Sequence, residues 1–147
     1  MVENFNPPAL GPAVGFSHAS RAGGFVFLGG QVGSDETGHI AEPGDIAQQF
    51  ARAIRNVGTA LEAAGSTPGQ AVKLTYYVTD VTAYRRGLKA IGAAYREVFG
   101  KHFPATSLFG VKELFDPDAL VEIECVALSE ALNNNSLRKP EPGLGPP

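Results

Sequence analysis

Disulfide-forming cysteines, long apolar runs and a one-sided charge are all missing from this chain of 147 residues. The single cysteine, Cys125, cannot pair within the chain, which is typical of a protein from a reducing compartment. No stretch approaches the roughly 18 apolar residues that a membrane span needs, and the first residues lack the cationic start and apolar run of a signal peptide. We therefore expect a cytoplasmic protein with no membrane partner.

The charge and the histidines exclude two further classes of partner. The formal net charge is -3, from 12 basic and 15 acidic residues, so the chain lacks the basic excess of most nucleic-acid-binding proteins. The histidines, His18, His39 and His102, have no metal-ligand spacing among themselves or with Cys125. We expect neither a nucleic-acid partner nor a metal site.

Hydrophobic residues make up 44% of the sequence, which is enough to form the core of one compact domain. Residues 44–65 and 82–100 have the spacings of three and four that predict amphipathic helices, the first capped by Asp45 and ended by Gly65. Gly100 ends the second, for which Thr82 or Asp80 is the predicted cap. The repeating apolar side chains are Ile46, Phe50, Ile54, Val57 and Leu61 in the first helix, and Tyr84, Leu88, Ile91, Tyr95 and Val98 in the second.

Residues 23–33, 71–79, 105–111 and 119–128 have the composition of strands, and residues 16–21 form a weaker candidate. Strands and helices in this order predict an α+β domain: one mixed β-sheet with two helices packed on one face. Phe25 and Phe27 point opposite to Val26 and Leu28, so the sheet is apolar on both faces. Two helices can cover only one face, so we expect a second copy of the chain on the other.

Glu122 and Glu124 share one face of the last predicted strand, where they could act in proton transfer or bind a substrate. The ordinary alternative is that the two carboxylates simply form a solvated rim of the strand. Residue types alone favour the solvated rim over a functional pair by about two to one. The apolar neighbours and the expected contact between copies bring the two interpretations close to even. A carboxyl group in such a cleft would have a raised pKa because of desolvation.

Four motifs in order resemble the Rid/YjgF family of imine and enamine deaminases, also called the endoribonuclease L-PSP family. They are "FVFLGGQVG", "NVGTALEAAGSTPGQAVKLTYYVTD", "FPATSLFGV" and "ALVEIECVA", and the similarity runs from about residue 10 to residue 128. The resemblance implies a chorismate-mutase-like sheet and a homotrimer with a cleft for a small molecule at each subunit interface. It also implies hydrolysis of imines or enamines without a cofactor.

Carried over residue by residue, the resemblance assigns catalysis to Glu122, which positions or activates water. It places Gly30, Gln31, Thr106 and Leu108 at substrate-binding positions, with Leu108 acting largely through its backbone. To these we add Phe16, which can approach the wall of a missing family tyrosine, and His18, which can shape selectivity. The chain departs from the family pattern at Thr106, where the deaminases have an arginine that clamps the substrate carboxylate. Gly29 replaces a serine and Ala13 a tyrosine. Without the arginine, binding of 2-iminoacids should weaken by about tenfold to more than a hundredfold unless His18 or Arg21 supplies a cation.

These observations divide the chain into an N-terminal arm (1–12), a Rid-like domain (13–130) and a disordered or extended tail (131–147). The leading functional hypothesis is an imine or enamine deaminase that uses Glu122. A non-catalytic homologue that binds a metabolite in the same cleft is the alternative, because Thr106 replaces the arginine. A ribonuclease or translation inhibitor is a weaker third hypothesis, which the acidic balance disfavours.

Overall fold

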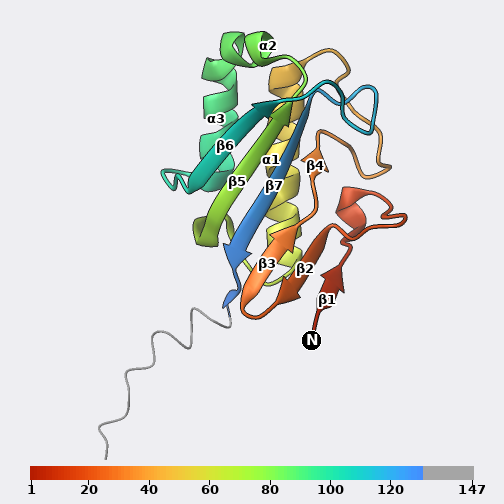
Figure 1. Cartoon of the computed structure of the whole chain (residues 1–147), viewed down its shortest axis with the longest axis vertical. Helices are drawn as coiled ribbons and strands as arrows, with labels where there is room; N and C mark the ends of the chain where they lie inside the picture. Colours follow the sequence, from red (N-terminus) through yellow and green to blue (C-terminus); the bar gives the residue numbers. More distant parts are fainter. Residues whose placement is uncertain (131–147) are drawn as a thin grey trace, which may run out of the picture.

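The computed structural model describes residues 1–130, in which one mixed sheet carries the helices on a single face (Figure 1). The tail predicted over residues 131–147 lies outside the described residues. The strands are β1 (Glu3–Phe5), β2 (Ala19–Ala22), β3 (Phe25–Leu28), β4 (Gln31–Val32), β5 (Ala71–Val78), β6 (Ala105–Gly110) and β7 (Val121–Leu128). The helices are α1 (Ile46–Ala63), α2 (Val81–Arg86) and α3 (Leu88–Phe99), with 3₁₀ turns η1 (Pro8–Leu10) and η2 (Pro68–Gln70).

The strands follow the order β1-β2-β3-β7-β5-β6, and β4 also pairs with β7. Only β5 and β6 run parallel; every other pair is antiparallel. The last strand in the sequence, β7, therefore lies in the middle of the sheet between β3 and β5 (Figure 1). The α+β prediction is confirmed, and the predicted N-terminal arm adds the edge strand β1 to β2.

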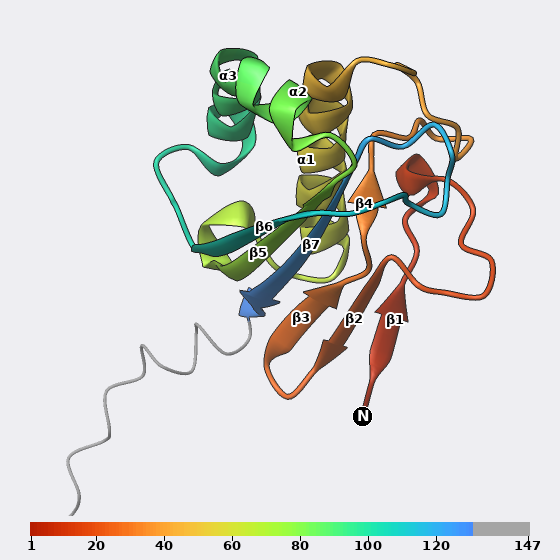
Figure 2. The ribbon, with the colours of Figure 1, turned by 45° about the horizontal axis from the view of Figure 1, so that its top comes forward.

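All three helices lie on the same side of the sheet (Figure 2). The Asp45 side chain accepts a hydrogen bond from the backbone N–H of Gln48 at 3.1 Å, which begins α1 at the predicted cap. The apolar stripe of α1 then packs on alternate residues of the two central strands. The buried residues at this contact include Phe50, Ile54, Val57 and Leu61 from α1, with Leu74, Val78, Val121, Ile123 and Cys125 from the sheet.

The prediction of two helices is wrong, because the segment 82–100 forms part of two separate helices, α2 and α3. Asp80 caps α2 by accepting a hydrogen bond from the N–H of Ala83 at 2.9 Å. Gly87 ends α2, with its N–H directed to the carbonyls of Ala83 and Tyr84, and α3 starts at the next residue. The apolar spacing continues across Gly87, so the sequence pattern concealed the break.

The strand predicted over residues 23–33 is divided into β3 and β4, which both pair with β7. Phe27 pairs with Val126, whereas Gln31 pairs with Ile123, so a step of four residues on one strand matches a step of three on β7. The additional residue lies at the Gly29–Gly30 pair and forms a bulge. The bulge lies next to Glu122, which pairs with Val32.

The sheet face away from the helices carries exposed aromatic rings and polar side chains. Phe25, Phe27 and Phe109 are 39%, 48% and 53% exposed, which is high for phenylalanine. Tyr77 stacks on Phe109 with ring centroids 6.1 Å apart, in register with Glu122 on β7. The described part of the chain places no helix on this face, as the alternation in the sequence predicted.

Candidate functional site

A cavity of about 500 Å³ lies beside the bulge, on the side of the sheet that carries Glu122. The N-terminal residues up to the start of β2, the Gly29–Gly30 bulge, β4 with the loop after it, β7 and the loop before β7 all contribute to it. Five of the predicted site residues line this cavity together: Phe16, His18, Gly30, Gln31 and Glu122. A cavity of this size suits a small organic molecule.

The carboxyl group of Glu122 packs directly against the backbone of Gly30. A Cβ atom at residue 30 would overlap the Oε1, Cδ and Cγ atoms of Glu122, so only glycine leaves this space free. The bulge and the glycine together let the side chain of Glu122 lie along the wall of the cavity. Glycine is therefore required at residue 30 of the sequence motif for steric reasons, whether or not a ligand binds.

Glu122 is half-buried, and its electrostatic environment favours the protonated acid. Burial raises the pKa of the Glu122 carboxyl above its ordinary value of 4.5, and the nearby charge of Glu124 raises it further. A carboxyl group of this kind exchanges protons more readily near neutral pH than an exposed glutamate does. The raised pKa predicted from the sequence is confirmed in direction.

His18 and Gln31 form a buried pair at the base of the cavity, 6% and 3% exposed. The Gln31 side-chain amide donates to the carbonyl of Gly29 at 3.2 Å and to Nδ1 of His18 at 3.3 Å. The other ring nitrogen, Nε2, donates to the carbonyl of Gly11 at 3.1 Å. Both ring nitrogens of His18 thus have partners within the wall. His18 is therefore a structural part of the wall and, with these bonds intact, has no ring nitrogen free to contact a substrate carboxylate.

Arg21, the other candidate for a replacement cation, has its partners elsewhere. Its Nη2 forms an ion pair with Glu3 at 3.1 Å, and its Nη1 donates to the carbonyl of Ala64 at 3.0 Å. The guanidinium also lies over the ring of Phe5, 5.0 Å from the centroid. These contacts tie β1 and the end of α1 to β2, and Arg21 is not among the residues that line the cavity.

Thr106 and Leu108 lie apart from the other predicted site residues. Their register partners on β5 are Leu74 and Tyr76, which point into the core, so both residues lie on the helix side of β6. Thr106 is exposed, and its hydroxyl donates to the carbonyl of Pro104 at 2.9 Å. Within one chain, Thr106 and Glu122 therefore do not line the same cavity.

Several residues in the wall were not predicted from the sequence, and two of them come from a loop far from the other site residues in the chain. Phe115 and Asp116 reach the Glu122 cavity from the loop between β6 and β7. Phe115 is fully exposed, and the Asp116 side chain accepts a hydrogen bond from the N–H of Asp118 at 2.9 Å. The segment "FDPD" predicts only a turn, because no periodicity connects it with a strand.

Two absences limit the chemistry of the described part of the chain, residues 1–130. It contains no group of three or more histidine, cysteine or acidic side chains that could hold a metal ion. None of its helices is both long enough and apolar enough to cross a membrane. The candidate site therefore consists of the carboxyl groups of Glu122 and Asp116, two serines, backbone amides, the hydrogen-bonded pair of His18 and Gln31, and apolar walls.

Comparison with known proteins gives consistent matches over nearly all of the described chain. The endoribonuclease L-PSP family profile matches residues 7–129. A RutC family protein of Pyrococcus abyssi is 36% identical over 125 residues, which cover 84% of this chain and 91% of the relative. A 2-iminobutanoate/2-iminopropanoate deaminase of Capra hircus is 30% identical over 131 residues, 89% of this chain and 90% of the relative. The crystal structure of the YjgF gene product of E. coli aligns with a TM-score of 0.76 at 28% identity, covering 86% of this chain and 98% of that one.

Proposed function

The chain belongs to the endoribonuclease L-PSP family, the family of the Rid, YjgF and RutC proteins, and from this premise we propose that it hydrolyses a reactive imine or enamine to a carbonyl compound and ammonia. The observation that carries the proposal is the position of Glu122. Its carboxyl group is half-buried against Gly30 in a cavity of about 500 Å³, and burial raises its pKa. Such a group can take a proton from water beside a bound substrate.

In the proposed reaction, Glu122 removes a proton from a water molecule while the oxygen of that water bonds to the carbon of the C=N group. The electron pair of the C=N bond moves to nitrogen, which takes up the proton that Glu122 accepted from the water. The resulting carbinolamine breaks its C–N bond, forms C=O and releases ammonia. Imine and water alone account for every atom of the products, so the chain needs no cofactor for this step. The hydrogen-bonded pair of His18 and Gln31 holds the wall in place.

The proposed catalytic unit is a homotrimer with one cleft at each subunit interface. Thr106 and Glu122 belong to the same cleft by family resemblance, yet they lie in different cavities of one chain. Two copies would resolve this difference if Thr106 of one copy faced Glu122 of the next. The exposed rings of Phe25 and Phe27 supply apolar surface for such an interface.

The assembly is tested by sedimentation or light scattering on the full chain. We expect a trimer, and Phe27→Asp should shift it toward the monomer because the substitution puts a charge on the bare sheet face. Val2→Asp, which replaces an exposed apolar residue ahead of β1, serves as the matched control and should leave the trimer intact. A wild-type protein that is monomeric at micromolar concentration contradicts the assembly.

The activity is tested with imines formed in situ by an amino-acid oxidase, following their decay with and without the protein. We expect acceleration that Glu122→Gln abolishes. Glu124→Gln is the matched control, since Glu124 is on the same strand and face but is exposed. Loss of activity in both variants, or in neither, would contradict the assigned role of Glu122.

Thr106 favours a second candidate function, a binding module that holds a metabolite without converting it. At this position the family deaminases have an arginine, and a threonine hydroxyl offers one hydrogen bond where a guanidinium offers two charged ones. No acceleration with any imine, together with thermal stabilisation by a small metabolite, would favour this alternative. The same preparations should leave RNA uncleaved if the ribonuclease hypothesis is wrong.

A further inference from the structure

The cavity that holds Glu122 is lined by acidic side chains and by no basic lysine or arginine. Glu122 and Asp116 contribute carboxyl groups to its wall. Neither of them forms an ion pair with a basic side chain among residues 1–130. A ligand with a carboxylate would therefore enter a cavity of its own charge, whereas a cationic ligand would be attracted by both acidic groups.

The loop between β6 and β7 fixes Asp116 at the wall of this cavity. Its Oδ1 atom accepts a hydrogen bond from the N–H of Asp118 at 2.9 Å, and its carbonyl accepts one from the N–H of Ala119 at 3.0 Å. The second carboxylate oxygen, Oδ2, has no hydrogen-bond partner in the part of the chain that the structure describes. Asp116 therefore supplies a fixed negative charge with one oxygen available to a ligand.

The basic side chains of the neighbouring segments are engaged elsewhere. Both ring nitrogens of His18 have partners within the wall, and Arg21 is paired with Glu3. Lys112 belongs to the same loop as the acidic group of the wall, but it lines another cavity together with Glu113. Within one copy, residues 1–130 therefore place no cation where it could neutralise a bound carboxylate.

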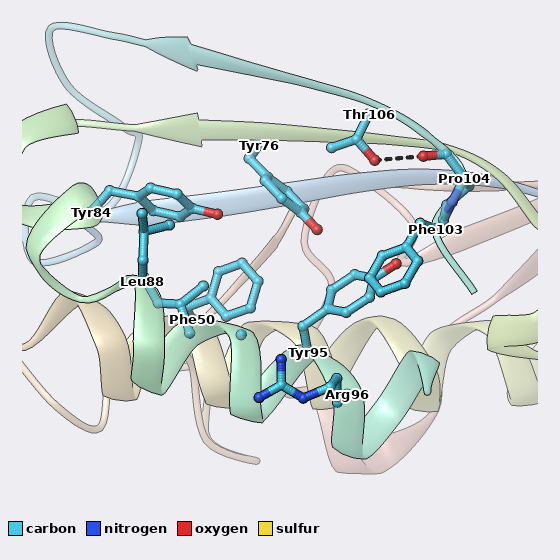
Figure 3. Close-up of a pocket in the computed structure, with 11 residues that line it drawn as sticks. Phe50, Tyr76, Tyr84, Leu88, Tyr95, Arg96, Phe103, Pro104 and Thr106 are labelled. Carbon is cyan, nitrogen blue, oxygen red and sulfur yellow. Dashed lines mark hydrogen bonds between the residues drawn. The ribbon is translucent and has the colours of Figure 1, made fainter. Parts of the chain in front are cut away.

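The neighbouring copy in the proposed trimer would add Thr106, which has no charge. Figure 3 shows Thr106 on β6 with its hydroxyl bonded to the carbonyl of Pro104, and Arg96 on α3, on the opposite wall of the cavity that the two share. A Cβ atom at Gly92 would lie 3.3 Å from Nη1 of Arg96, so the guanidinium folds back along its own helix. Thr106 would therefore bring a hydroxyl to the cleft without a cation beside it.

We propose that the cavity of Glu122 selects an imine that has no carboxylate and whose only charge is its protonated nitrogen, as in the imine of an apolar primary amine. This substrate class rests on the proposed function. The acidic side chains of the wall match the positive nitrogen, and the apolar side chains match an alkyl group. The apolar side chains are those of Leu10, Pro12, Phe16, Val32 and Phe115.

The hydrolysis of such a substrate balances without a further reactant. A protonated aldimine and one water molecule give an aldehyde and an ammonium ion. A C–O bond forms, the C–N bond breaks, and both hydrogens of the water end on nitrogen. Because the substrate and the leaving group are both cations, the acidic wall favours the whole reaction, which a substrate carboxylate would oppose.

The first test compares two imines whose carbon skeletons differ only by a carboxylate. A flavin-dependent amine oxidase forms the imine of isopentylamine, and an amino-acid oxidase forms that of leucine. The decay of each imine with the full-length protein is followed with semicarbazide as a trap. Relative to uncatalysed hydrolysis, we expect kcat/KM for the amine-derived imine to be at least about tenfold higher than for the leucine-derived one.

Three variants connect this preference with individual side chains. Asp116→Asn keeps the hydrogen bond from the Asp118 N–H but removes the charge, and should reduce the preference by about two- to fivefold. Asp118→Asn is the matched control, because Asp118 is an exposed acid of the same loop that does not line the cavity. Arg96→Gln should leave both rates unchanged, since no cation of the neighbouring copy takes part.

A binding measurement tests the selectivity of the cavity without catalysis. Isopentylamine and isocaproate, which have the same alkyl group and opposite charges, are titrated into full-length ¹⁵N-labelled protein. We expect isopentylamine to shift the amides of Ser17, Gly30 and Ser34, which line the cavity. Its dissociation constant should be at least about tenfold lower than that of isocaproate.

Several results would overturn the inference and leave the proposed function in place. They are equal or faster hydrolysis of the leucine-derived imine, loss of its hydrolysis in Arg96→Gln, and a preference that Asp116→Asn leaves unchanged. Equal or tighter binding of isocaproate, or no shift of the cavity amides up to about 10 mM isopentylamine, would overturn it as well. Failure to accelerate either imine would instead contradict the proposed function, and the substrate class with it.

Discussion

The carboxyl group of Glu122 occupies the space that a side chain at Gly30 would need. This close packing is possible because the bulge at Gly29–Gly30 brings the backbone of one strand against the side chain of another. The steric contact and the raised pKa of Glu122 thus have a common origin, since the backbone of Gly30, against which the carboxyl group packs, also helps to exclude water from that group.

Gly30→Ala should therefore inactivate the protein without unfolding it. The added methyl group displaces the Glu122 carboxyl, and we expect imine hydrolysis to fall by at least about tenfold. Overpacking of this kind costs about 1–3 kcal/mol of unfolding free energy. Gly69→Ala is the control, because a Cβ atom there has its nearest neighbour at 3.9 Å. Activity measured beside thermal unfolding separates the two effects, and full activity in Gly30→Ala would show that the carboxyl position is not required.

The pH dependence of activity should report the pKa of Glu122. As the base that accepts a proton from water, Glu122 must be ionised, so kcat/KM should fall as the pH drops through a value above 4.5. Glu124→Gln removes the charge that raises this pKa in addition to burial, and should move the acid limb to lower pH. Burial remains in the variant, so the limb should still lie above 4.5. If the acid limb of the profile lies at the same pH in Glu124→Gln as in the wild type, the charge of Glu124 does not influence the pKa of Glu122, and the prediction is wrong.

The same shift predicts a pH-dependent difference in stability. The native state holds the Glu122 proton more tightly than the unfolded chain does, so stability is lost as the pH rises through the interval between 4.5 and the raised pKa. Glu122→Gln cannot ionise and should melt at a higher temperature than the wild type at neutral pH. Below pH 4.5 the two melting temperatures should converge. A difference that persists unchanged at acid pH would point to packing rather than charge.

Thr106→Arg should restore the carboxylate clamp that the family resemblance assigns to this position. A charge-assisted bidentate pair contributes about 1.5–3 kcal/mol, which corresponds to about ten- to hundredfold tighter binding of a 2-iminoacid. The measurement is kcat/KM for imines made from 2-aminobutanoate, with Thr106→Gln as a control of similar reach but no charge. An unchanged value in Thr106→Arg would mean that Thr106 does not face the reaction site.

Much of the fold could be predicted because burial alternates so regularly along the strands. Val26, Leu28, Ile123 and Cys125 all lie on the core face, as their spacing indicated. The break at Gly87 could not be predicted, because the apolar side chains on either side of it keep the spacing of one helix. Only the hydrogen bonds of the Gly87 N–H show where α2 ends.

The Glu122 cavity could be predicted in part, and the reason for the limit is geometric. Motif resemblance brought together Gly30, Gln31 and Glu122, which the structure places in one cavity. It could not show that Thr106 lies on the opposite side of the sheet, since that depends on the register of β6 against β5. Nor could it show that both ring nitrogens of His18 are hydrogen-bonded within the wall, because their partners, Gln31 and Gly11, are distant from His18 in sequence.

The bulge between β3 and β4 also restricts how this segment can change in length. Both strands pair with β7, and side chains alternate between faces with a period of two, so a one-residue deletion at Gly29–Gly30 cannot be absorbed locally. Either Phe25 and Phe27 would turn into the core or Gln31 would leave its partner His18. Related sequences that keep this pocket should therefore tolerate substitution along β3 and β4 far more readily than gaps between them.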